Sequence, residues 1–176
     1  RLSNKSYSNW RKIKSFSEFL GKKYELIFAK SSHDKDKLND IFQRNIHYLG
    51  NLKFYLEIDI SKIKKNILCF ASIHKAEFDS IIQIIKKLNL NLFESIIIIP
   101  RHIQFSNKLR LMINGDFKNK IQIHDKFGDN LPIFDRSKIV FMGGSLINHG
   151  GQNPLEPLSR GCYITCGKNN DNFKDQ

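Results

Sequence analysis

The second half of the chain alternates short apolar runs with stretches of helical periodicity, and this alternation constrains the fold most. Residues 96–99 are all isoleucine and are followed by Pro100, as expected for a strand covered on both faces. We expect strands at 66–72, 95–101, 120–125, 138–142 and 162–166, and helices at 74–88, 106–113, 130–137 and 153–159. Strands and helices that alternate with short links favour an α/β fold with a doubly wound, mostly parallel sheet.

The first part of the chain is less regular and is strongly basic. It predicts a helix over residues 5–20, a buried strand over 24–31, a helix over 35–43 and a second short strand over 45–51. The net charge of the chain is +12, and residues 1–24 carry a clear excess of lysine and arginine. A basic amphipathic helix can lie on anionic lipid or on nucleic-acid phosphates. The alternative is an ordinary core-packed helix whose basic side faces water.

The length and the ends of the chain indicate part of a larger protein. A chain of 176 residues makes one medium domain or part of two, and it starts at Arg1 without a methionine, so we expect a fragment. No apolar run approaches the ~18 to 20 residues that span a bilayer, and no signal peptide is recognisable.

The cysteines number three and have no framework spacing, which predicts a reducing compartment. Four residues of strand would separate Cys162 and Cys166 by ~13 Å, too far for a disulfide or a shared metal. We therefore expect Cys69, Cys162 and Cys166 to be thiols of the core.

A glycine-rich stretch from Phe141 to Pro157 has the spacing of a phosphate site. A strand runs into Gly143 and Gly144, a loop carries a second glycine pair, and Asn153 opens a helix. Paired glycines let the backbone approach a ligand closely, and a helix N-terminus offers N–H groups and the positive end of a dipole. Asn, Pro and Glu at the N-cap, N1 and N3 positions also form an ordinary capping box. Both interpretations can hold.

Polar residues and glycines follow each expected strand, at the edge of a parallel sheet where ligands bind. They are Ser72 and His74, Pro100 to His102, Gly128 to Asn130, Gly143 to Ser145, and Gly167 with Asn172. Arg101 is the natural phosphate clamp among them, because a guanidinium is always charged and binds oxyanions through two donors. A surface arginine at a strand end is the alternative.

Several classes of site are unsupported by the sequence. His74, His102 and His149 fit no HxH, HExxH or CxxC spacing, so we expect polar caps or substrate donors and no metal. Dinucleotide, P-loop and nucleophile-elbow motifs are all missing, and no cofactor is expected. Only residues 1–24 interleave basic and aromatic side chains as a nucleic-acid module does, which would leave the glycine-rich edge unexplained. No nucleic-acid partner is expected.

Five segments occur in a fixed order along the chain: RLSNKSYSNW at 1–10, GNLKF at 50–54, ASIHKAEF at 71–78, IIPRH at 98–102 and GGSLINHGGQNPLEP at 143–157. Together they resemble the bacterial 3-deoxy-D-manno-octulosonic acid (Kdo) transferases, which add Kdo from CMP-Kdo to a lipid A precursor. The last segment is long and specific, and the resemblance covers essentially the whole chain. It implies a glycosyltransferase of lipopolysaccharide synthesis at the anionic cytoplasmic face of the inner membrane. Such an enzyme is peripheral there, or is anchored by a segment outside this chain.

The resemblance implies the two-Rossmann-domain (GT-B) architecture. Residues 1–50 would be the tail of the acceptor-binding N-terminal domain, 51–65 a linker and 66–176 the donor-binding domain, cut before its end. The implied contacts to CMP-Kdo are Pro100, Arg101, Gly128, Asp129, Asn130, Asn153, Pro154, Leu155 and Glu156, and the supporting pocket is Ser72, His74, Gly143, Gly144, Ser145, Gly151 and Asn172. The family's catalytic carboxylate base would lie upstream of Arg1, so this chain alone is expected to be inactive.

The chain departs from the family at several of these positions. Gln152 stands where the family usually has histidine, Ile73 where it has threonine and Ala76 where it has glycine. The usual Gly-Glu-Leu is here Gly128 to Asn130, and an arginine often found near Phe105 is missing. Unlike histidine, glutamine cannot titrate near neutral pH, so the departures bear on substrate preference. Two alternatives stay open: a GT-B transferase for another nucleotide sugar, and a non-catalytic basic nucleotide- or RNA-binding module.

Overall fold

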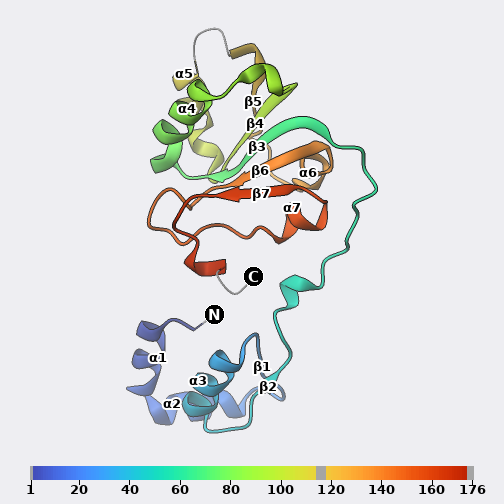
Figure 1. Ribbon diagram of the computed structural model, residues 1–176. Helices are drawn as coiled ribbons and strands as arrows, with labels where there is room; N and C mark the ends of the chain where they lie inside the picture. Colours follow the sequence, from blue (N-terminus) through green and yellow to red (C-terminus); the bar gives the residue numbers. More distant parts are fainter. Residues whose placement is uncertain (1, 114–117, 174–176) are drawn as a thin grey trace. The chain divides into compact units, whose positions relative to one another are not determined.

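The structure, a computed structural model, describes residues 2–113 and 118–173. The chain divides into two compact units, Arg1–Tyr55 and Leu56–Gln176. The first unit contains a two-stranded sheet and the second a five-stranded sheet (Figure 1).

The first unit is a small helical assembly around one short parallel strand pair. Its elements are α1 (Asn4–Arg11), α2 (Lys14–Lys22), β1 (Phe28–Ala29), α3 (Ser32–Phe42), β2 (His47–Tyr48) and the 3-10 turn η1 (Leu52–Phe54). The chain runs from β1 to β2 through α3, which makes the connection long enough for the crossover that parallel strands require. The helix α2 packs on α3. The N-terminus of α3 is capped by Ser31, whose hydroxyl accepts a hydrogen bond from the Asp34 N–H at 3.1 Å.

Three expectations for this unit are wrong. The single helix expected over 5–20 breaks at Ile13, whose φ of −118° and ψ of 47° lie outside the helical region. The strands expected over 24–31 and 45–51 shrink to two residues each, and Phe28, in the strand expected to be buried, is exposed. With only two short strands, the sheet has no interior in which a longer apolar strand could be covered.

The second unit has the predicted architecture. Its strands are β3 (Lys65–Ile73), β4 (Ser95–Pro100), β5 (Ile121–Ile123), β6 (Ser137–Met142) and β7 (Tyr163–Cys166), and its helices are α4 (Phe78–Lys87), α5 (Ser106–Met112), α6 (Leu131–Arg136) and α7 (Leu155–Ser159). The 3-10 turns are η2 (Lys75–Glu77), η3 (Leu90–Leu92), η4 (Ile103–Phe105), η5 (Lys118–Lys120) and η6 (Asp171–Phe173). The strand order is β5-β4-β3-β6-β7, and every neighbouring pair is parallel. The doubly wound parallel α/β sheet is confirmed.

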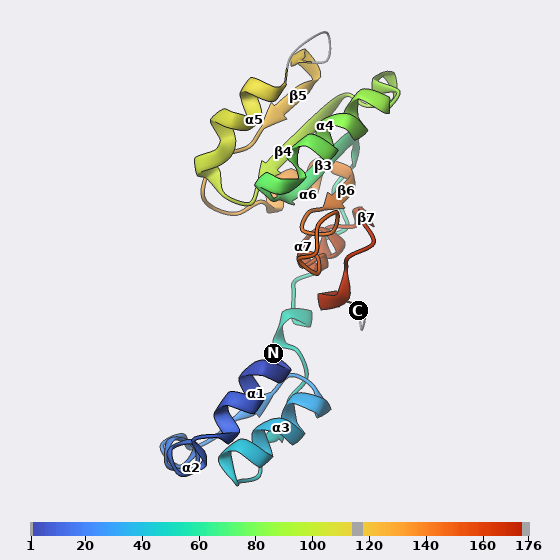
Figure 2. The same cartoon turned by 90° about the vertical axis from the view of Figure 1, so that its left-hand side faces the viewer.

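The central strand β3 serves two cores, one on each face of the sheet. Leu68 and Phe70 belong to a core shared with α4 and α5, while Ile67 and Cys69 belong to a core shared with α6. The helices α4 and α5 lie on one side of the sheet and α6 on the other (Figures 1 and 2). The side chains of a strand alternate between faces, so burial on both faces requires the continuous apolar runs seen in the sequence.

The cysteines follow the two faces only in part. Cys69 and Cys162 are buried as expected, and burial raises the pKa of both thiols, which leaves them protonated and unreactive. Cys166 is exposed, so the expectation of a core thiol is wrong there. It lies at the end of β7, an edge strand of the sheet, where cover is incomplete.

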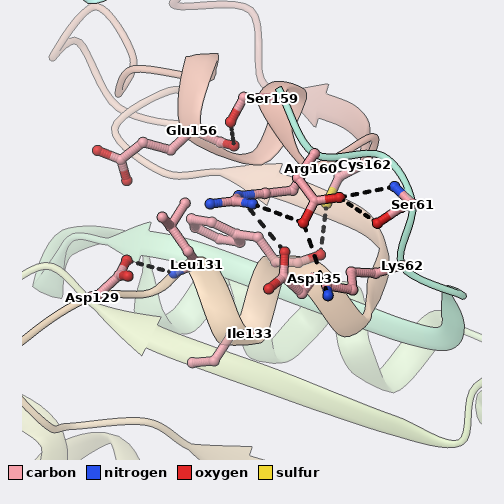
Figure 3. A network of polar contacts seen from close by, with 12 residues as sticks. Ser61, Lys62, Asp129, Leu131, Ile133, Asp135, Glu156, Ser159, Arg160 and Cys162 are labelled. Atoms are coloured by element: carbon pink, nitrogen blue, oxygen red, sulfur yellow. Dashed lines mark hydrogen bonds and ion pairs between the residues drawn. The ribbon is translucent and has the colours of Figure 1, made fainter. Parts of the chain in front are cut away.

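A charged network attaches the start of the second unit to the helices α6 and α7 (Figure 3). The side chain of Arg160 is only 13% exposed, and its guanidinium lies 3.4 Å from Asp59 Oδ2 and 3.7 Å from Asp135 Oδ1. The Asp59 N–H donates to the carbonyl of Ser159 at 3.0 Å, and Lys64 Nζ donates to the carbonyl of Phe134 at 2.7 Å. Residues 59–64, part of the expected linker, are therefore bonded to the second unit.

Replacing Arg160 by alanine should destabilise the second unit. The change leaves the partly buried Asp135 carboxylate without its cation and Asp59 with only the longer pair to Lys62 at 4.0 Å, which costs more than the loss of an exposed pair. We expect the melting temperature to fall by about 5 °C in Arg160→Ala. The matched control is Arg110→Ala, since Arg110 pairs with Asp125 on the surface and is 46% exposed. Equal shifts for the two variants in differential scanning calorimetry would show that the network adds nothing.

Candidate functional site

The candidate site lies where β3 and β6 end side by side. The chain runs outward from β3 to β4 and β5 on one side, and then returns to β6 and β7 on the other. Open α/β sheets bind ligands beyond the carboxyl ends of the two strands at such a reversal, and we call this edge of the sheet, beyond Ile73 and Met142, the crevice. Six of the seven residues assigned to the supporting pocket lie at or beyond these two strand ends: Ser72 in the last part of β3, His74 after it, and Gly143, Gly144, Ser145 and Gly151 after β6.

The two strand ends approach each other closely at Ser72 and Gly143. The Gly143 N–H donates to the carbonyl of Ala71 at 2.8 Å, and a Cβ added to Gly143 would lie 2.3 Å from the Ser72 carbonyl oxygen. Ser72 itself has a φ of 57°, which is unusual for a residue with a side chain, and β3 shifts its register against β4 between Phe70 and Ile73. Strained backbone of this kind is concentrated at functional sites.

A buried carboxylate, which had no predicted role, holds these strand ends together. Glu77 has no exposed surface and accepts three backbone hydrogen bonds. Its Oε2 accepts from His74 N–H at 2.9 Å and from Gly144 N–H at 2.7 Å, and its Oε1 accepts from Leu146 N–H at 3.0 Å. The glycine turn after β6 therefore gives at least two of its amides to an internal anion and not to a ligand.

Three histidines and a glutamine gather around the same crevice. The ring of His74 lies 4.3 Å from that of His149 and 6.1 Å from that of His102, measured between centroids. His74 Nε2 is 3.0 Å from Gln152 Nε2. Because an amide nitrogen only donates, His74 accepts this bond when it is neutral, with its proton on Nδ1. The departure at Gln152 thus falls directly on the site.

The environment of His74 predicts a pH dependence of stability. Burial lowers the pKa of His74, and the neighbouring His149 lowers it further. Above about pH 6.5 the imidazole is neutral in the folded and the unfolded chain. Below that pH the unfolded chain binds the proton first, so stability falls as the pH drops from about 6.5 through the lowered pKa.

We expect His74→Asn to flatten this dependence. Melting temperatures of the variant should change less between about pH 5 and 6.5 than those of the wild type, because the titrating group is gone. His33→Asn is the control, since His33 is exposed in the first unit. Indistinguishable pH profiles for wild type and His74→Asn would contradict this assignment.

The loop between β6 and α7 is held by hydrogen bonds to residues that follow β7. Ser145 is fully buried, and its Oγ accepts from Gly167 N–H at 2.8 Å. Asn172 Nδ2 donates to the carbonyls of His149 at 3.1 Å and Gly151 at 3.4 Å. The predicted pocket residues Ser145, Gly151 and Asn172 therefore act as supports that fix the loop carrying His149.

The second group of predicted residues precedes α6 and α7. The helix α6 follows Gly128 to Asn130, and the Asp129 carboxylate accepts from Leu131 N–H at 2.8 Å. The helix α7 follows Asn153 and Pro154, and Asn153 Oδ1 accepts from Leu155 N–H at 3.2 Å. The helices α6 and α7 that these two loops precede contact each other (Figure 3).

The helix expected over 153–159 is shorter than predicted. It covers Leu155–Ser159, and Pro154 at its N-cap makes no side-chain cap bond. The capping box is therefore not formed as expected, although Asn153 caps Leu155 N–H. A helix of five residues has a small dipole, so an anion at its start would depend on individual amides and on nearby cations.

Arg101 supplies such a cation beside the crevice. Its N–H donates to the Ile73 carbonyl at 2.8 Å, so the residue after β4 sits next to the end of β3. Its side chain is exposed, and in the described parts of the chain it forms no ion pair with a carboxylate. Lys75 adds a second positive charge, and its Nζ lies 4.7 Å from the ring centroid of Phe105. The arginine that the family often has near Phe105 is absent from this sequence.

Glu77 and Arg160 were not predicted from the sequence to have a role. Glu77 could have been noticed, because it is in register with Ile81 and Ile85 on the buried side of the expected helix. An acidic residue on an apolar stripe needs an internal partner. Arg160 is the C-cap residue of α7 and has no such signal. Within residues 2–113 and 118–173, no group of three or more His, Cys, Asp or Glu side chains is placed to hold a metal. Nor is any described helix long and apolar enough to cross a membrane.

Comparison with known proteins relates both units to one family. Residues 1–56 match the sequence model of a family described as 3-deoxy-D-manno-octulosonic-acid transferase (kdotransferase). A 3-deoxy-D-manno-octulosonic acid transferase from Rickettsia bellii is 31% identical over 182 residues, which cover 89% of this chain and 43% of the relative. One from Aquifex aeolicus is 27% identical over 161 residues, covering 85% and 46%. A bifunctional glycosyltransferase/methyltransferase from Fusobacterium nucleatum is 26% identical over 206 residues, covering 99% and 32%.

The fold also matches a solved structure. The C-terminal CMP-Kdo binding domain of WaaA from Acinetobacter baumannii aligns with a TM-score of 0.52 and 23% identity, covering 64% of this chain and 66% of that domain. The chain spans less than half the length of the curated relatives named above. The resemblance seen in the sequence is confirmed: the chain is a relative of the 3-deoxy-D-manno-octulosonic acid transferases.

Proposed function

We propose that the protein is a glycosyltransferase that moves Kdo from CMP-Kdo to a lipid A precursor in lipopolysaccharide synthesis. The observation that carries the proposal is the exposed Arg101 beside the β3–β6 crevice, whose guanidinium forms no ion pair with a carboxylate of residues 2–113 and 118–173. A nucleotide-sugar donor presents an anion that matches such a group in charge and geometry. The similarity to Kdo transferases over both units supports Kdo as the sugar.

We further propose a division of labour along the chain. Residues 1–50 would be the tail of an acceptor-binding domain, and residues 66–176 the donor-binding domain. The donor would contact Pro100 and Arg101, Gly128 to Asn130, and Asn153 to Glu156. The resemblance implies that the catalytic carboxylate base belongs to an earlier part of the acceptor domain, so transfer would need more than these 176 residues.

The chemistry follows from where charge grows during transfer. A hydroxyl of the acceptor attacks the anomeric carbon of Kdo while the bond to CMP breaks, so the transition state resembles an oxocarbenium ion and the leaving phosphate gains negative charge. Arg101 would stabilise that charge through its paired donors, and the amides that begin α7 would assist. Because α7 is short, Arg101 would supply the larger share.

The acceptor and its location are also proposals. The first unit presents basic side chains together with exposed apolar ones: Phe16 is 54% exposed and Phe19 is 56% exposed, both on α2, which also carries Lys14 and Lys22. Such a surface would suit an anionic membrane that holds a lipid acceptor. We propose the cytoplasmic face of the inner membrane as the place of transfer.

Nucleotide selectivity tests the proposed function. A nucleotide that binds only the folded protein raises its melting temperature. We expect CMP to stabilise the full-length protein and to do so more than UMP, UDP or GDP at equal concentration. Preferential stabilisation by UDP or GDP would favour a transferase for another nucleotide sugar. Tight RNA binding with a steep salt dependence, and no effect of CMP, would favour a basic binding module.

A further inference from the structure

Glu77 occupies a position in the donor-binding unit that its chemistry makes unusual. It is fully buried at the start of α4, and no lysine or arginine of the described residues forms an ion pair with it. A buried carboxylate without a cation is costly unless its oxygens accept several hydrogen bonds. Here three backbone N–H groups, those of His74, Gly144 and Leu146, fill this role.

These three bonds join segments that are far apart in the sequence but flank the same crevice. His74 follows β3, whereas Gly144 and Leu146 belong to the turn that follows β6. The Glu77 side chain thus crosses the point at which the sheet reverses its winding. The turn it holds leads directly into the loop with His149 and Gln152, and then to Asn153 before α7.

The bonding pattern requires a carboxylate and not merely a polar side chain. All three partners are donors: two meet Oε2 and one meets Oε1. A glutamine would keep one accepting oxygen, but its amide nitrogen would face a third N–H group, donor against donor. An aspartate would keep the charge, but with one methylene fewer it could not reach all three.

We propose that Glu77 is a positioning residue of the donor site: an internal anion that fixes the turn after β6 and thereby sets His149, Gln152 and Asn153 opposite His74 and Arg101. Glu77 acts through the backbone and touches no ligand, since its oxygens are already occupied. This inference rests on the proposed function, because it assigns the positioned loop to the binding of CMP-Kdo.

The test compares Glu77→Gln with wild type in the full-length protein, using two independent measurements. Hydrogen exchange followed by NMR or mass spectrometry reports the protection of the Gly144 and Leu146 amides, and calorimetric titration with CMP reports donor affinity. We expect protection of the turn to fall while that of α4 is kept. We also expect the Kd for CMP to rise about tenfold or more, since a hydrogen bond to a charged group typically changes an equilibrium by that factor.

Glu94→Gln is the matched control. Glu94 also accepts a backbone N–H, that of Asn66 at 3.3 Å, but it lies at the opposite end of the strands and is exposed. Glu94→Gln should change neither the protection of the Gly144 and Leu146 amides nor the Kd for CMP. If Glu77→Gln does not fold, Glu77→Asp replaces it with the same two expectations.

Each outcome decides something different. Unchanged protection of Gly144 and Leu146 in the Glu77 variant would overturn the positioning role, whatever CMP does. Lost protection with an unchanged Kd for CMP would overturn the link between this turn and donor binding. A wild-type protein that binds no CMP would overturn the proposed function, and with it the assignment of the positioned loop to the donor.

Discussion

Replacing Arg101 by alanine in the full-length protein should lower the rate of Kdo transfer by at least ~100-fold. The guanidinium is the charged group that we expect to face the leaving phosphate, and removal of one such donor typically raises a barrier by on the order of 3 kcal/mol. The fold should not suffer, because the side chain is exposed and the bond from Arg101 to Ile73 uses only the backbone.

The lysine variant separates charge from geometry. Arg101→Lys keeps the positive charge but loses the planar pair of donors, so we expect transfer between that of wild type and Arg101→Ala. Arg136→Ala is the control, because Arg136 is an exposed arginine in the last turn of α6, away from the carboxyl ends of the strands. Initial rates with purified donor and acceptor give the measurement. Near-normal turnover in Arg101→Ala would remove this residue from the mechanism.

Replacing Gly143 by alanine should damage both stability and function. The new Cβ would lie 2.3 Å from the carbonyl oxygen of Ser72 and 2.9 Å from Ile73 Cα, and both are backbone atoms that cannot turn away. The ends of β3 and β6 must therefore separate. We expect a loss of about 3 kcal/mol in the free energy of unfolding, at the upper end of overpacking. Transfer should fall by as much as ~100-fold in any protein that stays folded, because the crevice is displaced.

A second glycine gives the control for this substitution. A Cβ added at Gly50 would meet nothing within 4 Å, so Gly50→Ala adds only the backbone cost of its positive φ of 89°. That cost is roughly 1–2 kcal/mol and falls on the first unit. Chemical denaturation and donor titration of both variants make the comparison. If Gly143→Ala matched Gly50→Ala in stability and bound CMP normally, the close approach of the two strand ends would be unnecessary for stability and for donor binding.

The second unit could be predicted from the sequence because its signals are local and repeated. A short run of β-branched residues that ends at a proline, such as residues 96–99, favours a strand covered on both faces, and the isoleucine stripe of α4 has a helical period. Glycines and polar residues after each run then had to meet at one edge of the sheet. The sequence alone therefore predicts that Ser72, Gly143 and Arg101 lie at one edge of the sheet.

The remaining features depend on contacts between distant residues. The bonds of Glu77 to the turn after β6 span 67 and 69 residues of sequence. The ion pair of Arg160 with Asp59 joins a residue near the end of the second unit to one near its start. Nothing in the local sequence states such a partner. The first unit was predicted less well, since its strands are two residues long and its helix breaks at Ile13 without a glycine or proline.

A crystal structure of the full-length protein with bound CMP tests the central claim most directly. We predict the phosphate within hydrogen-bonding distance of the Arg101 guanidinium, with the nucleoside extending toward Asn153 and the Glu156 carboxylate near the ribose hydroxyls. Well-ordered CMP that contacts neither Arg101 nor Glu156, or only one of them from a different cavity, would contradict the account.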